Sequence, residues 1–148
     1  TQAKQAFLIV AALENSTQAQ EIKDFGDRNR IFVNVVDKTN YCSFIVPAIV
    51  DRGNLLIAIS TSGKSPAIAS QIRKQLEKQF GYEYSDLLEA LAEIRPQVKK
   101  TFHTFEQRKD FYLELIQKNL LKTIQTAGLT AVREKIQQEL RKQTDLED

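Results

Sequence analysis

The hydrophobic pattern of this chain changes in type near its middle, and that change limits the folds open to it. Three short apolar runs rich in β-branched residues, at residues 7–12, 32–36 and 55–60, are each bounded by polar turns. Such runs are typical of strands buried on both faces of a parallel sheet. Beyond Gly81 the apolar residues recur at helical spacing instead. The sequence therefore predicts an α/β region followed by an all-α region.

The segment between the first two apolar runs, ENSTQAQEIKDFGDRNR, predicts a helix. Asn15 or Ser16 has a side-chain oxygen suited to cap its N-terminus, and Gly26 is expected to interrupt or end it. A helix between two strands gives a β-α-β unit in which the strands run parallel. We therefore expect a partial Rossmann-like parallel sheet at the start of the chain.

A second helix is predicted over residues 66–79, directly after the third apolar run. Ser65 is a typical N-cap residue, and Pro66 has its φ angle preset for the first helical turn. Within this helix three apolar residues repeat every four positions, which predicts one buried stripe. These residues are Ile68, Ile72 and Leu76.

The second half of the chain predicts a series of amphipathic helices. Pro96 should kink the first of these or start a new one, because a proline inside a helix loses a hydrogen bond. Thr104 and Gln107 have the spacing of a capping box, and Gly128 is a plausible helix end. The expected apolar faces comprise Leu87, Leu88, Leu91 and Ile94; then Phe111, Leu115, Leu121 and Ile124; and finally Leu129, Val132, Ile136 and Leu140.

Composition narrows the class of protein further. The 148 residues carry a net charge of +2, which is too balanced to argue for nucleic acid as a partner. Lys99, Lys100, Arg108 and Lys109 alternate with acidic residues in the sequence, which also disfavours a basic stripe. Cys42 is the only cysteine, so no internal disulfide forms, and no apolar run is long enough to cross a membrane. We expect a cytoplasmic protein.

The loop between the third apolar run and the following helix, STSGKS at residues 60–65, is a candidate binding site. Free backbone N–H groups at a strand-to-helix junction bind anions in open α/β sheets. The hydroxyls of this loop suit a carboxylate or phosphate, and Gly63 permits close backbone approach. The alternative is a helix cap, which is the favoured role for Ser65. Lys64 and Arg52 would attract a polycarboxylate, or are simply solvated charges.

Four motifs follow one another over residues 31–80: NVVD, C-x-F-x-x-PA, RG-x-L-x-IAIST-x-G-x-SP and IR. In this order and spacing they resemble the centre of the siroheme synthase N-terminal module, a family of precorrin-2 dehydrogenases and sirohydrochlorin ferrochelatases. FLIVAALEN resembles the family strand that ends in a turn beside the dinucleotide. The downstream helices resemble the family's C-terminal helical region, and R-x-x-FY at Arg108 is a weaker match. The resemblance spans nearly the whole chain.

The resemblance implies a division of the chain and a function. Residues 1–46 would be the C-terminal part of a Rossmann-like NAD-binding domain, residues 47–80 a dimerisation segment, and residues 81–148 a helical region. The implied enzyme is a homodimer that oxidises precorrin-2 to sirohydrochlorin with NAD. Insertion of ferrous iron, as a ferrochelatase, is possible in the same cleft. The apolar strand LLIAIS independently favours a dimer, because it needs a pairing partner that a second subunit would supply.

The family motif also implies which residues carry the chemistry. Asp37 matches the proposed acid/base group of the family and would pass the metal transiently in a chelatase, whereas without the family it would be read as a turn residue. Asn34 either hydrogen-bonds a substrate or fixes a strand edge, and its side chain should lie opposite Val33 and Val35. Thr61 matches a position associated with the active-site cleft. The full expected set is Asp37 as catalytic residue; Asn34, Thr61, Ser62, Gly63 and Ser65 toward substrate; and Ala11, Ala12 and Asn34 toward the cofactor.

One departure from the family leaves a second function open. The family places a glycine-rich pyrophosphate loop after its first strand, and this chain contains no G-x-G-x-x-G or triple glycine. We expect the chain to be a fragment that begins at a later strand of the Rossmann half. The alternative is a non-catalytic dimeric remnant that binds a tetrapyrrole or a partner without the dinucleotide. Cys42 is expected in the core, and His103 at the surface or at a helix cap.

Overall fold

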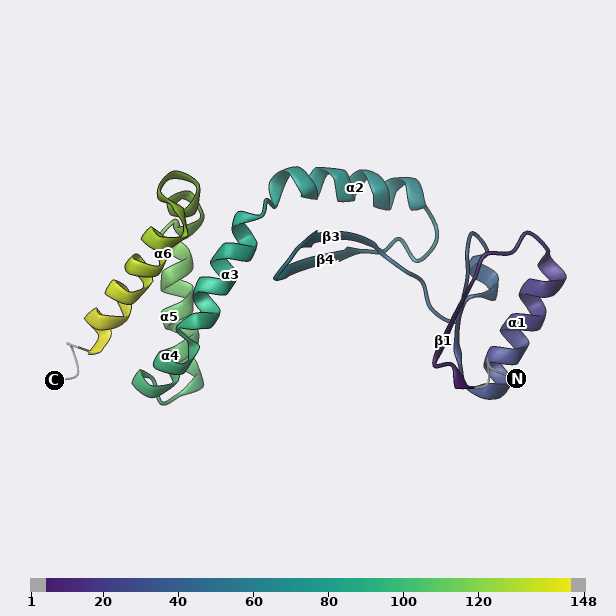
Figure 1. Cartoon of the computed structure of the whole chain (residues 1–148), viewed down its shortest axis with the longest axis horizontal. Coiled ribbons are helices and arrows are strands. Elements are labelled where there is room, and N and C mark those ends of the chain that lie inside the picture. Colours follow the sequence, from purple (N-terminus) through teal and green to yellow (C-terminus); the bar gives the residue numbers. More distant parts are fainter. Residues whose placement is uncertain (1–4, 145–148) are drawn as a thin grey trace. The chain divides into compact units, whose positions relative to one another are not determined.

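A computed structural model describes residues 5–144. The start of the predicted first region and the end of the predicted last region therefore lie outside the described residues. The chain divides into two compact units. Thr1–Ile49 with Ala58–Lys74 form the first, which we call the αβ unit. Val50–Ile57 with Gln75–Asp148 form the second, which we call the helical unit. The expected α/β architecture followed by helices is confirmed (Figure 1).

The αβ unit is built on a β-α-β arrangement. Strands β1 (Leu8–Ala11) and β2 (Phe32–Val35) are parallel, with Leu8 opposite Phe32 and Ala11 opposite Val35. Helix α1 (Ser16–Asn29) connects them and covers one face of the sheet. Between helix and sheet lies a small core of Ala11, Ala19, Val33 and Val35. Parallel strands with a helical crossover are what the sequence predicted.

The prediction that these strands are buried on both faces is wrong within this chain. Side chains alternate across a strand, so only every second residue can face α1. On the other face Leu8, Val10 and Phe32 are 50%, 58% and 60% exposed. Phe32 contacts the ring of Phe44 edge-on, which is partial cover for that face.

Helix α1 begins where the sequence indicated but ends later. Asn15 is the N-cap, since its side-chain oxygen accepts a hydrogen bond from the N–H of Thr17 at 2.8 Å. Gly26 does not interrupt the helix, which continues to Asn29 and ends with Arg30 in the left-handed region. Gly26 is buried, and a Cβ there would collide with Val33. The glycine therefore allows close approach of helix and strand rather than a helix end.

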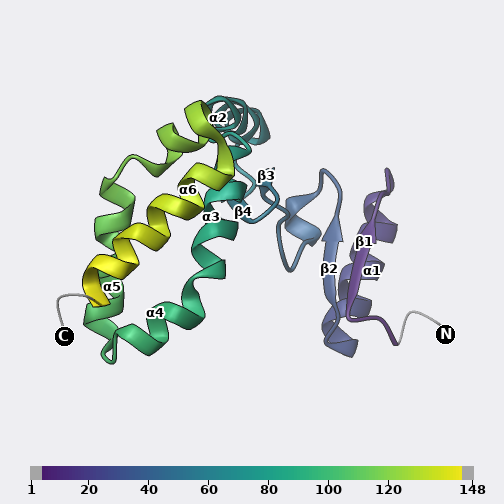
Figure 2. The ribbon, with the colours of Figure 1, turned by 60° about the vertical axis from the view of Figure 1, so that its left-hand side comes forward.

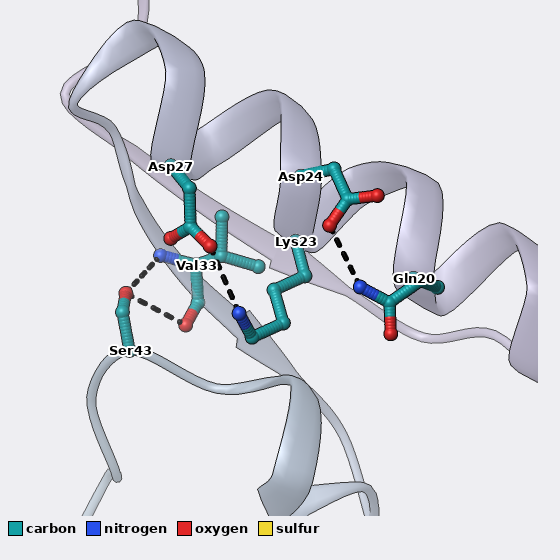
Figure 3. Close-up of polar contacts among 6 residues, drawn as sticks. All are labelled: Gln20, Lys23, Asp24, Asp27, Val33 and Ser43. Atoms are coloured by element: carbon teal, nitrogen blue, oxygen red, sulfur yellow. Dashed lines mark hydrogen bonds and ion pairs between the residues drawn. The ribbon is translucent and has the colours of Figure 1, made fainter.

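Figure 3 shows polar contacts within α1 and, separately, between β2 and the segment that follows it. Lys23 pairs with Asp27 at 2.8 Å, and Gln20 donates to Asp24 at 2.7 Å. Ser43 accepts a hydrogen bond from the N–H of Val33 at 2.7 Å. The segment after β2 thus takes over the main-chain hydrogen bonding that a neighbouring strand would otherwise supply.

Strands β3 (Ala48–Arg52) and β4 (Leu55–Ile59) form a separate two-stranded sheet. Only Gly53 and Asn54 join them, which makes the pair an antiparallel hairpin. The third apolar run, which the sequence placed in a dimer-forming segment with a second subunit as its expected pairing partner, therefore pairs with β3. This pairing also gives LLIAIS a hydrogen-bonding partner within its own chain.

Helix α2 (Pro66–Gln79) occupies the predicted residues, but its predicted buried stripe does not form. Ile68 is 53% exposed, and Ile72 and Leu76 are half-buried. The buried residue of this helix is Ala69. The four-residue spacing therefore predicted the helix correctly but did not predict which of its side chains are buried.

The helical unit contains α3 (Glu83–Glu93), α4 (Arg95–Thr101), α5 (Phe105–Gln117) and α6 (Leu120–Thr144). Figure 2 shows α6 lying along α3 and α5. Pro96 lies in the first turn of α4, as expected of a proline that starts a helix. Gly128 breaks α6 with φ 80° and ψ 176°. Leu121 and Ile124 belong to α6 and not to α5, which ends at Gln117.

The core of the helical unit draws on all four helices. Most of the predicted apolar positions are confirmed in it, and Ala90, Val98, Phe102 and Leu120 join them. Its buried members are Ala90, Ile94, Val98, Phe102, Phe111, Leu115, Leu120, Val132, Ile136 and Leu140. None of the described helices is long and apolar enough to span a membrane.

Thr104 and Gln107 form the predicted capping box at the start of α5. The Thr104 hydroxyl accepts from the N–H of Gln107 at 3.2 Å, and Gln107 Oε1 accepts from the N–H of Thr104 at 3.0 Å. Thr104→Ala should lower the free energy of unfolding by about 1 kcal/mol, whereas Thr104→Ser should cost much less. Urea unfolding of the three proteins checks this. Equal stability of the alanine variant and the parent would show that the cap contributes nothing.

Candidate functional site

The first group of predicted site residues lies at one edge of the β1–β2 sheet. The N–H of Val36 donates to the carbonyl of Ala11 at 2.9 Å, so the two strands end side by side. Ala12 and Asp37 are the residues that follow, and both are exposed. Ligands of open α/β sheets bind outside the carboxyl ends of the strands. The fold therefore brings Ala11, Ala12 and Asp37 to the edge where a ligand is expected.

Asp37 has an unusual backbone conformation at this edge. Its φ angle is 61°, in the left-handed region that few residues other than glycine, asparagine and aspartate adopt. The turn is held by the N–H of Lys38, which donates to the carbonyl of Val35 at 3.1 Å. Such a conformation persists only when neighbouring contacts fix it.

Lys38 ties the two strand ends together. Its Nζ donates to the carbonyl of Glu14 at 2.6 Å and to the hydroxyl of Ser16 at 3.0 Å. These residues lie in the turn after β1 and at the start of α1. The ammonium thus fixes the turn that carries Asp37 against the turn that carries Ala12. The sequence reasoning missed Lys38, although a cation directly after the candidate aspartate was visible.

Asn34 lies on the face of β2 opposite Val33 and Val35, as predicted. Its Nδ2 donates to the carbonyl of Phe44 at 2.9 Å. This contact favours the second of the two roles considered for Asn34, that of fixing the strand edge. A direct role toward substrate or cofactor stays a prediction.

Cys42 contacts the end of β2, next to the turn that carries Asp37. Its Sγ accepts from the N–H of Val35 at 3.2 Å and lies 3.3 Å from the Val35 carbonyl. Cys42 is partly buried and packs against the core of the αβ unit. This placement is the expected core role.

The second group of predicted residues forms the loop between β4 and α2. Ser62 and Gly63 both have positive φ angles, 54° and 75°. The Thr61 hydroxyl accepts from the N–H of Ser65 at 3.2 Å and lies 3.1 Å from its carbonyl. Ser65 Oγ accepts from the N–H of Ile68 at 3.4 Å, which is the expected helix cap. Thr61 and Ser65 therefore both have structural roles in shaping the loop.

Gly63 connects the loop to the turn that carries Asp37. A Cβ on Gly63 would lie 2.7 Å from Thr39 Cγ2, so the loop and the short 3-10 helix η2 (Thr39–Tyr41) are in close contact. Thr39 is two residues beyond Asp37. Both groups of candidate residues thus lie in the αβ unit and are linked by this contact.

A cavity of about 230 Å³ lies against this loop. Ser60, Thr61 and Gly63 line it, together with the start of α2 and the segment 45–48 that precedes β3. Asp37, Asn34, Ala11, Ala12, Ser62 and Ser65 are not among its lining residues. The structure thus separates the loop cavity from the strand edge, although the contact between Gly63 and Thr39 makes them neighbours.

Ser70 and Arg73 line the same cavity and were not predicted as site residues. They lie one and two turns into α2 from Pro66, on the face that Pro66 and Ala69 also present to the cavity. Helical spacing from the loop would have identified them. Arg73 supplies a cation to a cavity whose other polar side chains are hydroxyls.

Arg52 and His103, which were also singled out from the sequence, make hydrogen bonds at helix ends. Arg52 Nε donates to the carbonyl of Phe80 at 2.7 Å, its Nη2 to the carbonyl of Glu77 at 2.9 Å, and the guanidinium lies over the Tyr82 ring. It therefore binds the C-terminal end of α2, where a cation is favourable. His103 is exposed beside the capping box, and its N–H donates to Gln107 Oε1 at 3.1 Å. Both placements favour structural roles.

A dinucleotide would find only part of its site among these residues. Ala12 is exposed at the strand edge, and Asp37 lies at the end of the neighbouring strand. The glycines of the chain are at positions 26, 53, 63, 81 and 128, so none lies in the turn after β1. The strand edge is therefore where one end of a dinucleotide is expected, and the turn after β1 carries no glycine-rich pyrophosphate loop. No group of three or more potential metal ligands occurs within the described residues.

Comparison with known proteins gives three consecutive family matches. Residues 1–48 match a putative NAD(P)-binding family, residues 52–79 the central region of sirohaem biosynthesis proteins, and residues 83–140 the sirohaem synthase dimerisation region. The order of these matches follows the order of the predicted regions, whose exact boundaries stay predictions.

Curated relatives give the same result. Siroheme synthase of Ruthia magnifica is 39% identical over 109 residues, which are 74% of this chain and 23% of the relative. Siroheme synthase of Citrobacter koseri is 33% identical over 140 residues, 94% of this chain and 31% of the relative. The chain thus spans less than a third of the length of these relatives. The resemblance drawn from the sequence motifs is confirmed.

A solved structure described as SirC, precorrin-2 dehydrogenase, has a similar fold. It superposes with a TM-score of 0.60 at 22% identity and covers 92% of this chain and 63% of its own. At that identity the similarity establishes the fold alone. The Rossmann-like α/β arrangement followed by helices is therefore shared with a protein of that description.

Proposed function

Because the chain matches a putative NAD(P)-binding family followed by two regions of sirohaem biosynthesis proteins, we propose that it is part of an NAD-dependent precorrin-2 dehydrogenase, which oxidises precorrin-2 to sirohydrochlorin. One observation carries this proposal beyond the family matches. The turn that carries Asp37 lies at the carboxyl end of a parallel sheet and touches the hydroxyl-rich loop through Gly63. A proton acceptor and a binding loop for anions thus lie in the αβ unit and are linked by this contact.

The oxidation removes a hydride and a proton from precorrin-2. NAD supplies the hydride acceptor when it is bound. Asp37 accepts the proton, since a carboxylate exposed at the strand edge can act as a general base. Lys38 positions Asp37 by holding its turn against the turn after β1. The roles of Ala11, Ala12 and Asn34 toward the cofactor belong to the same proposal.

The loop cavity holds part of the carboxylate rim of the tetrapyrrole. Precorrin-2 bears several carboxylates, and Arg73 with the hydroxyls of Ser60 and Thr61 would face them. Ser62, Gly63 and Ser65 contribute to this binding indirectly, by fixing the conformation of the loop. The homodimer expected from the dimerisation region is part of this proposal.

A ferrochelatase step is the finer part of the proposal. Ferrous iron would be a substrate, passed by Asp37 as an exposed oxygen ligand at the same strand edge. In that step the carboxylate also accepts the two pyrrole protons that the metal replaces, one at a time, and releases each to water.

The test of the dehydrogenase is anaerobic oxidation of precorrin-2 by the purified intact protein with NAD. We expect NADH and sirohydrochlorin to form in equal amounts, followed by their absorbance. Binding of sirohydrochlorin without any reduction of NAD would contradict the proposal and favour a non-catalytic tetrapyrrole-binding protein. Binding of neither molecule would contradict both functions.

Thr61→Glu should weaken binding of sirohydrochlorin by about tenfold or more. The new carboxylate would face the carboxylates of the ligand at short range in a half-buried position, where screening is incomplete. Thr61→Ser should bind almost as the parent does, because it keeps the hydroxyl that bridges to Ser65. Fluorescence titration measures the affinity, and a thermal melt of each variant shows that the fold is kept. Unchanged affinity of Thr61→Glu would mean that the loop does not hold the tetrapyrrole.

A further inference from the structure

The helical unit contains a cavity of about 440 Å³ between α4 and α5. This volume lies in the range typical of sites for small molecules. Its floor includes Val98, which is fully buried, and one wall is the ring of Phe105, which is 68% exposed. An aromatic ring left this open to water beside a cavity is a surface on which a flat group can stack.

Four cations line this cavity, and none of its described lining residues is a carboxylate. Helix geometry explains why, although basic and acidic residues alternate in the sequence. Positions 105, 108, 109 and 112 share one face of α5, and positions 95, 98 and 99 share one face of α4. Asp110 and Glu114 fall on another face of α5 and line a different cavity. Basic and acidic residues therefore alternate along the sequence but lie on different faces of α5.

Most of these cations lack a carboxylate partner. Within residues 5–144, no carboxylate lies within ion-pair distance of Arg95, Lys99 or Lys109. Arg108 is partly committed to the fold, since its Nη1 donates to the carbonyls of Phe102 and His103 at 2.9 and 3.0 Å. Like charges gathered in a concave surface raise the local positive potential.

Tyr112 adds a hydrogen-bond donor to the same wall. It is half-buried, and burial raises the pKa of its phenol above the ordinary value, against a smaller opposing effect of Arg95. The phenol therefore keeps its proton at neutral pH. The cavity thus combines a buried apolar floor, an exposed ring, a neutral donor and four cations.

We propose that this cavity binds a small organic anion with a flat apolar body. The ring of Phe105 and the Val98 floor would take the apolar body, and Arg95, Lys99 and Lys109 would bind carboxylate or phosphate groups. Packing of this surface on the same surface of a second copy across a two-fold axis would oppose like charges, which disfavours that self-contact. The site uses residues of the helical unit alone and does not depend on the proposed dehydrogenase activity.

Isothermal titration calorimetry of the whole chain with three probes tests this site. Naphthalene-2,6-dicarboxylate and 2-naphthyl phosphate carry a flat body with anionic groups, and naphthalene-2,6-dimethanol carries the body alone. We expect at least one of the anions to bind at least about tenfold more tightly than the neutral diol, because hydrogen bonds to charged groups are strong. The tighter of the two anions identifies the preferred group. Raising the salt concentration should weaken the anions and leave the diol unchanged.

Lys99→Gln and Lys109→Gln should each weaken the preferred anion by about three- to tenfold. Lys100→Gln is the matched control, because Lys100 is an exposed lysine on the same helix that does not line the cavity. An equal loss in the control would show general charge attraction only and would overturn the site. So would equal affinity for the diol, or no binding of either anion at millimolar concentration. Tight binding of single-stranded RNA that both small anions fail to displace would also overturn it.

Discussion

Asp37→Asn is expected to lower the rate of precorrin-2 oxidation by about a hundred- to ten-thousand-fold, the usual contribution of a general base. The amide cannot accept the proton that leaves with the hydride. The fold should be unaffected, because asparagine tolerates the left-handed region at least as well as aspartate does, and Asp37 adopts φ 61°. Binding of NAD should be nearly unchanged. Steady-state rates and cofactor titration of the purified protein measure the two effects separately.

Asp110→Asn is the control for this experiment, since it removes an exposed carboxylate from α5. It should oxidise precorrin-2 at the parent's rate. If the folded Asp37→Asn variant did so as well, Asp37 would be a turn residue and no part of the mechanism. A loss of NAD binding in parallel with the rate would instead assign Asp37 to the cofactor site.

Gly63→Ala is expected to destabilise the αβ unit by about 2–4 kcal/mol. A side chain at φ 75° is strained by about 1–2 kcal/mol, and a crowded contact adds a similar amount. The new methyl group would lie 2.7 Å from Thr39 Cγ2. Because Thr39 is two residues from Asp37, the displacement should also lower the oxidation rate. Chemical denaturation and the rate assay measure both consequences.

The double variant Gly63→Ala/Thr39→Ser separates strain from collision. Serine lacks the methyl group that the new side chain would meet, so part of the stability and of the rate should return. The backbone strain at residue 63 would remain. If Thr39→Ser restored nothing, the loop and the Asp37 turn would not be coupled through this contact.

The sequence alone determined the elements whose signals are local. Asn15, Pro66, Pro96 and the pair Thr104 and Gln107 mark helix starts through hydrogen bonds or fixed φ angles that involve only a few neighbouring residues. The change from short apolar runs to helical spacing correctly predicted an α/β region followed by helices. The motifs over residues 31–80 were sufficient to indicate the family.

Tertiary structure decided which faces of these elements are covered and which distant residues meet. Gly26 looked like a helix end, but Val33 occupies the space where its side chain would be. LLIAIS looked like a strand that needs a pairing partner from a second subunit, but the two-residue turn at Gly53 and Asn54 makes it half of a hairpin. Lys38 reaches a carbonyl 24 residues away, and Arg73 meets the loop across a cavity. Side-chain burial and such long-range contacts depend on how elements pack in three dimensions, and periodicity within one element carries no information about its neighbours.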